Sequence, residues 1–140
     1  MTAAIAAKKV ATILRCVERA RAERDAAAAD FKRDYTRQDA ALLNIIRACE
    51  AAVDLANMLI RERRLGVPSD MKDSFRALEQ AALIPASLAA RLRKMIGFRN
   101  IAVHQYQALD IDIVDSVIRT SLADLITFAE AVGPHFADRG

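Results

Sequence analysis

The sequence predicts an all-α protein: an up-and-down bundle of about five helices that forms a single domain over residues 1–140. The hydrophobic share is 54%, but only 5% of the residues are aromatic, and the chain holds just four glycines and three prolines. Alanine and leucine are strong helix formers, and so few breakers cannot supply the turns of a β-sandwich. Apolar residues also recur at steps of three and four along most of the chain, which is the period of an amphipathic helix.

The first expected helix covers residues 3–34. Its first half carries one apolar stripe, made of Ile5, Val10, Ile13, Leu14 and Val17. The second half, "RAERDAAAADFKRD", is rich in alanine, which continues a helix but offers little side-chain area to bury. A long helix with so thin a stripe is often completed by a second subunit, so we expect the bundle to form a homodimer.

The second expected helix covers residues 37–63 and has a broad apolar face for the core. Its opposite face holds Arg47, Glu50, Asp54 and Arg61, which we expect to meet solvent or another subunit. Gly66 suits a left-handed C-terminal cap of this helix.

Three further helices complete the bundle. The third is expected over residues 70–81, with Ser69 as its N-cap. Pro85 fits the first turn of the fourth, which carries "LAARLRKMIGFRNIAVH". The fifth is expected over residues 110–132 without interruption, and its N-terminal aspartates complement the helix dipole.

Charge and cysteine content exclude few partners. The 21 basic and 18 acidic residues give a net charge of +3, which is compatible with nucleic acid without requiring it. Cys16 and Cys49 lie in apolar helical patterns, and we expect them to be buried, reduced thiols of a cytosolic protein. No metal-ligand spacing, signal peptide or apolar run of about 20 residues is present, so we expect a soluble cytoplasmic protein without a metal or a membrane anchor.

The stretch "GFRNIAVHQY" gathers Arg99, Asn100, His104 and Tyr106. On a continuous helix Asn100 and His104 share one face, and Tyr106 returns to within about 20° of Arg99. Arg99 and His104 then lie about 140° apart, so one straight helix does not aim both at one phosphate. Two copies related by a two-fold axis could bring them together, and so could local unwinding near the helix end.

These side chains suit RNA cleavage. Histidine exchanges protons near neutral pH, and the planar arginine fork matches phosphate oxygens. Together they can help a ribose 2′-hydroxyl attack its own phosphodiester without a metal. Arg91, Arg93 and Lys94, on the same helix, would add positive charge for an RNA backbone.

The competing interpretation is structural. A histidine near a helix end more often caps or pairs, and arginines on a helix usually face water. Residue types alone favour this structural interpretation over RNA cleavage.

The sequence around the motif resembles a known family. "RNIAVHQY" matches the R-x4-H-x-Y signature of the HepT-like toxins, a branch of the HEPN superfamily. The segments "RQDAALLNIIRACEAAVDLANMLIRERRLGVP" and "MIGFRNIAVHQYQALDIDIV" are also similar to that family, so the resemblance extends from about residue 17 to residue 132.

The resemblance implies the toxin of a type VII HEPN/MNT toxin–antitoxin system, a metal-independent endoribonuclease with no cofactor. Its site would form at a dimer cleft, with Arg99 binding phosphate, His104 as general acid/base and Asn100 in support. It also implies an MntA-like nucleotidyltransferase antitoxin that transfers AMP to Tyr106. If the helix continues through the motif, that AMP would lie over Arg99.

Two other functions remain open on this sequence. The chain could be a non-catalytic subunit that binds a nucleotide or presents a substrate to a minimal nucleotidyltransferase. It could also be a plain dimerisation module. Cleavage of mRNA or tRNA by the isolated protein separates the first interpretation from both.

Overall fold

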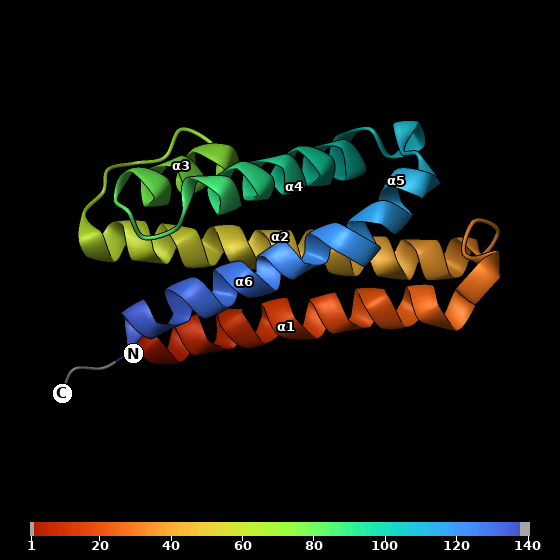
Figure 1. Cartoon of the computed structure of the whole chain (residues 1–140), viewed down its shortest axis with the longest axis horizontal. Helices are drawn as coiled ribbons and strands as arrows, with labels where there is room; N and C mark the ends of the chain where they lie inside the picture. Colours follow the sequence, from red (N-terminus) through yellow and green to blue (C-terminus); the bar gives the residue numbers. More distant parts are fainter. Residues whose placement is uncertain (1, 138–140) are drawn as a thin grey trace.

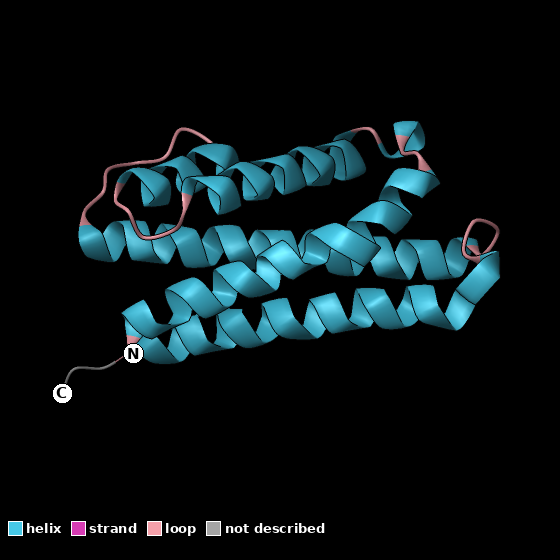
Figure 2. Cartoon of the chain, viewed as in Figure 1, coloured by secondary structure: helices cyan, strands magenta, loops and turns pink. Residues whose placement is uncertain are grey.

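The computed structural model describes residues 2–137, and all regular structure in that range is helical, as predicted (Figure 2). Short 3-10 turns follow α1, α4 and α6. The α-helices are α1 (Thr2–Ala27), α2 (Tyr35–Arg63), α3 (Met71–Gln80), α4 (Ala86–His104), α5 (Ile111–Ser116) and α6 (Leu122–Val132). Counting α5 and α6 as one interrupted helix gives the five predicted helices.

The long helices lie side by side along one axis (Figure 1). The first and second run antiparallel and make the most extensive contact in the fold. Helix α4 packs against α2, and α6 lies across both α1 and α2. The start of α1 and the end of α6 share one end of the bundle, and the connection from α4 to α5 lies at the opposite end (Figure 1). One continuous apolar core joins these helices. Within it the rings of Phe75 and Phe128 pack edge to face, with their centroids 5.3 Å apart.

The first helix ends at Ala27, earlier than the predicted residue 34. Ala28 adopts the left-handed region with φ 50°, and Phe31 turns inward until it is only 4% exposed. Alanines in the run have almost no area to bury, so burying Phe31 is a stronger driving force than continuing the helix. The Asp34 carboxylate then accepts a hydrogen bond from the Arg37 N–H and caps the start of α2.

Two predicted caps are displaced by one or two residues. Arg64, not Gly66, takes the left-handed position that ends α2, while Gly66 has φ 103° in the loop that follows. Asp70, not Ser69, caps α3, because its carboxylate accepts from the Asp73 N–H. The Ser69 N–H donates in return to the Asp73 carboxylate, as in a capping box.

The last helix is not continuous as predicted. A π-helical turn, Val117–Ser121, separates α5 from α6. A π turn admits an extra residue per turn and changes which side chains face the core. Apolar period alone does not reveal this, because buried residues continue through the junction: Val114 before the π turn, Ile118 within it and Leu122 after it.

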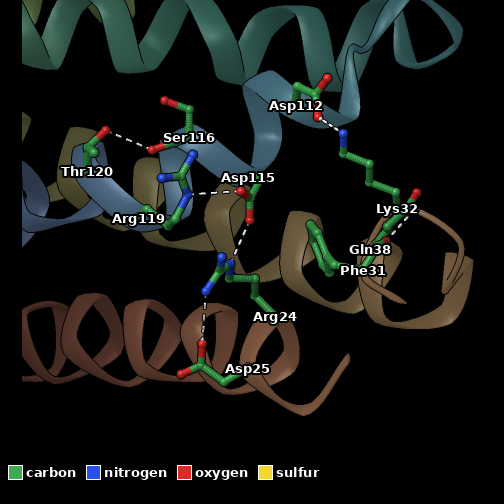
Figure 3. A network of polar contacts seen from close by, with 10 residues as sticks. All are labelled: Arg24, Asp25, Phe31, Lys32, Gln38, Asp112, Asp115, Ser116, Arg119 and Thr120. Atoms are coloured by element: carbon green, nitrogen blue, oxygen red, sulfur yellow. Dashed lines mark hydrogen bonds and ion pairs between the residues drawn. The ribbon is translucent and has the colours of Figure 1, made fainter. Parts of the chain in front are cut away.

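A charged network fixes α5 and the π turn to the end of α1 (Figure 3). Asp115 accepts hydrogen bonds from Arg24 Nε at 2.6 Å and from Arg119 Nε at 2.9 Å, and Lys32 pairs with Asp112 at 2.7 Å. Partial burial raises the pKa of Asp115, but the hydrogen bonds and charges of the two arginines outweigh it and leave that pKa below its usual value. The network thereby holds the helix that follows the R-x4-H-x-Y segment at one end of the bundle.

Both cysteines are buried and free. Burial raises the pKa of the Cys49 thiol to about 12, so it stays protonated and unreactive at neutral pH. Within residues 2–137 no three histidine, cysteine or acidic side chains gather as metal ligands. None of the helices in that range has the length and apolar character to cross a membrane.

Candidate active site

Arg99 lies on α4 against the middle of α2, with 14% of its side chain exposed. Its Nη2 donates to Glu50 Oε1 at 3.0 Å, and its Nη1 donates to Asn100 Oδ1 at 3.1 Å. Its buried Nε has no hydrogen-bond partner within the described residues. The two acceptors hold the guanidinium from two sides and orient it.

Asn100 contacts Arg99, and not His104, with which it was expected to share a helix face. The helical angle placed it with His104, but its carbonyl accepts from Arg99. The Asn100 side chain therefore contacts the Arg99 guanidinium directly.

His104 is the last residue of α4, and its side chain is exposed. No hydrogen bond to its imidazole is found in the described part of the chain, so it neither caps nor pairs as the structural interpretation expected. The α-helix is unbroken from Arg99 to His104. Five residues of helix separate the two side chains by about 140° and about 7.5 Å along the axis. The chain unwinds only afterwards, at Gln105, with φ −136° and ψ 46°.

Tyr106 is not on the same helix as Arg99, so the predicted stacking of Tyr106 over Arg99 is wrong. It opens a 3-10 turn, Tyr106–Ala108, and its hydroxyl donates to the Asp39 carboxylate near the start of α2. That hydrogen bond, partial burial and the Asp39 charge raise the pKa of Tyr106. Asp39 and Glu50 are eleven residues apart on α2, about 16 Å along its axis. The tyrosine and the arginine are therefore anchored at separate points of α2.

The basic residues predicted to follow RNA are mostly engaged elsewhere. Arg91 pairs with Asp124 at 2.9 Å, and Arg93 pairs with Glu79 at 3.2 Å. These two arginines reach toward α6 and α3, on different sides of α4. Lys94 is exposed and has no ion pair within the described residues. The three do not form one basic surface.

A basic groove that was not predicted from the sequence runs between α1 and α2. It has a volume of about 470 Å³, and Arg15, Arg19 and Arg47 line it. None of these three arginines has an ion-pair partner in the described part of the chain. Glu50 lies on the wall of the same groove and pairs with Arg99, which connects the groove to the motif.

Only the antiparallel packing of α1 on α2 brings these arginines together. Arg15 and Arg19 are one turn apart on the exposed side of α1. This spacing was the one feature of the sequence that pointed to the groove. Nothing in the sequence pairs them with Arg47.

Comparison with known proteins gives one consistent family. A family model described as "Ribonuclease HepT-like" matches residues 13–132. The mRNA nuclease HepT of Shewanella oneidensis is 44% identical over 124 residues, which cover 89% of this chain and 92% of that protein.

Solved structures agree. The tri-AMPylated Shewanella oneidensis HEPN toxin in complex with an MNT antitoxin superposes with a TM-score of 0.87 and 43% identity, covering 91% of this chain and 96% of that one. A chain of a toxin–antitoxin complex with AMP-PNP gives a TM-score of 0.87 and 42% identity, covering 91% and 97%. The chain therefore belongs to the ribonuclease HepT-like family and is a toxin-type endoribonuclease.

Proposed function

We propose that this ribonuclease cleaves RNA at a composite site in a homodimer, with Arg99 as phosphate clamp, oriented by Asn100, and His104 as general acid/base. The observation that carries the proposal is the unbroken helix between Arg99 and His104. Because the helix does not unwind between them, Arg99 and His104 of one chain point in different directions. A second copy related by a two-fold axis can instead bring Arg99 of one chain and His104 of the other to the same phosphate.

The chemistry requires no metal. His104 takes the proton of a ribose 2′-hydroxyl, which attacks the neighbouring phosphorus and displaces the 5′-oxygen. A histidine in its protonated form then gives a proton to that oxygen. Arg99 stabilises the charge that builds on the phosphate oxygens. The products are a 2′,3′-cyclic phosphate and a 5′-hydroxyl, and their formation should continue in EDTA.

Mixing two inactive variants tests the shared site. Arg99→Ala and His104→Ala should each be inactive alone, because every site then lacks one group. If Arg99 of one copy works with His104 of the other, subunit exchange creates one intact site per heterodimer. An equal mixture should regain about one quarter of parental activity, because about half of its dimers are heterodimers with one working site.

The control is each variant mixed with itself under the same exchange conditions, with cyclic phosphate ends mapped on a defined mRNA. A mixture as inactive as its components would show that the two residues act within one chain. Parental activity in His104→Ala alone would reject the catalytic assignment.

We further propose that the RNA backbone follows the basic groove formed by Arg15, Arg19 and Arg47. Among residues 2–137 no acidic side chain pairs with these three arginines, so their charges are available to neutralise phosphates, unlike those of Arg91 and Arg93. Binding of RNA to the inactive His104→Ala chain should weaken when any groove arginine becomes alanine. The logarithm of the binding constant should then depend less steeply on the logarithm of the salt concentration, by about 0.7 for each phosphate that is no longer neutralised.

The measurement is a titration of labelled single-stranded RNA at several salt concentrations. Arg76→Ala, which removes an exposed arginine on α3 outside the groove, is the matched control. An unchanged salt dependence for the groove variants would place the RNA elsewhere.

We also propose that an MntA-like nucleotidyltransferase antitoxin neutralises the toxin in the cytoplasm by AMPylating Tyr106. The solved Shewanella complex supports this, since that toxin is tri-AMPylated and bound to an MNT antitoxin. Tyr106 lies two residues beyond His104, and it is 52% exposed and so accessible to a partner enzyme. A nucleotide there adds bulk and negative charge beside His104, which opposes binding of RNA.

A further inference from the structure

The Tyr106 hydroxyl has a defined partner, the Asp39 carboxylate on α2. Tyr106 is exposed and the hydrogen bond lies at the surface, so another protein can reach the pair. The tyrosine ring lies on the wall of a pocket of about 260 Å³ that Tyr35, Leu42 and Ile111 also line. The hydrogen bond to Asp39 fixes where the hydroxyl oxygen points.

A phenol is a weak nucleophile while it keeps its proton. Hydrogen bonding to Asp39 raises the pKa of Tyr106, so the free phenolate is scarce at neutral pH. A carboxylate already in contact with the hydroxyl can take the proton as the oxygen attacks, as an aspartate does for the substrate hydroxyl in protein kinases. Asp39 has no ion-pair partner among residues 2–137, so its lone pairs are available to accept that proton.

We propose that Asp39 is the proton acceptor for nucleotide transfer to Tyr106, so that the toxin itself supplies the general base for its own AMPylation. This inference rests on the proposed modification of Tyr106. The partner nucleotidyltransferase then has to supply the bound nucleoside triphosphate, but no base for the tyrosine.

The transfer is a displacement at phosphorus. The Tyr106 oxygen forms a bond to the α-phosphorus of ATP, and the bond from that phosphorus to the oxygen bridging to the β-phosphate breaks. Pyrophosphate leaves with the electron pair. The hydroxyl proton passes to the Asp39 carboxylate and from there to water.

The test compares two substitutions at Asp39. Asp39→Asn keeps an oxygen that accepts the tyrosine hydrogen bond but cannot hold the proton as a carboxylate does. Asp39→Ala removes both functions. Each full-length variant is mixed with its cognate nucleotidyltransferase antitoxin, ATP and Mg²⁺, and the initial rate of AMP uptake is followed by mass. We expect both variants to be slower by about 10²-fold or more, the usual size of a general-base contribution.

Matched controls separate the possible failures. Asp25→Asn removes an exposed aspartate in a surface ion pair on α1 and should leave AMP uptake unchanged. Circular dichroism and retained RNA cleavage show that the Asp39 variants are folded.

Parental uptake by Asp39→Asn together with slow uptake by Asp39→Ala would mean that Asp39 only positions the hydroxyl, and parental uptake by both would remove it from the reaction. Either result overturns the base assignment and leaves Tyr106 as the acceptor. AMP uptake by Tyr106→Phe, or none by the parent chain, would instead overturn the proposed function.

Discussion

Replacing His104 with alanine should reduce RNA cleavage by about 10²- to 10⁴-fold, the range expected when a general acid/base is removed. The side chain is exposed at the end of α4 and makes no hydrogen bond in the described structure. Its removal should therefore change the free energy of unfolding by no more than about 0.5 kcal/mol. The measurement is the initial rate on mRNA and tRNA in EDTA, with product ends mapped and unfolding followed in urea.

The second histidine provides the matched control. His135 contacts Arg63 at 3.1 Å in the 3-10 turn after α6, far along the chain from the motif. His135→Ala should cleave RNA at the parental rate. Equal losses for both variants would indicate a general effect of histidine removal on the fold and would remove His104 from the mechanism.

Replacing Tyr106 with phenylalanine should abolish AMP uptake, because no acceptor oxygen remains. The ring is retained, and the hydrogen bond to Asp39 that disappears is at the surface, so stability should fall by no more than about 1 kcal/mol. Cleavage of RNA by the isolated variant should stay near the parental rate. The measurement is the mass of the chain after incubation with the antitoxin and ATP, followed by an RNA cleavage assay on the same sample.

Tyr35→Phe makes the same chemical change at a neighbouring tyrosine that is 74% exposed. It should take up AMP normally and lose its ribonuclease activity on modification. Uptake abolished in Tyr35→Phe but kept in Tyr106→Phe would move the modification site to Tyr35.

The helices could be predicted well from the sequence, and their ends less well. The apolar period of α2 and the scarcity of breakers were sufficient for the all-α class. The alanine run after residue 21 suggested a helix to residue 34, but burial of Phe31 ended it at Ala27. Alanine propensity is a local preference of less than about 1 kcal/mol per residue, which burial of one aromatic ring can exceed.

The candidate site, too, could be predicted only in part from the sequence. The motif predicted Arg99, Asn100, His104 and Tyr106 as site residues from their types and spacing. Helical angles assumed one straight helix through Tyr106, and the break at Gln105 made the tyrosine placement wrong. Asp39 and Glu50, which hold the tyrosine and the arginine, could not be paired with them from sequence.

By itself, the sequence determined the helical class and the R-x4-H-x-Y motif, because helix propensity, apolar period and residue spacing are local properties. Tertiary structure alone decided that Glu50 accepts from Arg99, where the Tyr106 hydroxyl is held, and that Arg15, Arg19 and Arg47 share one groove. Those contacts join residues tens of positions apart, and the packing of one helix on another sets which of their faces meet.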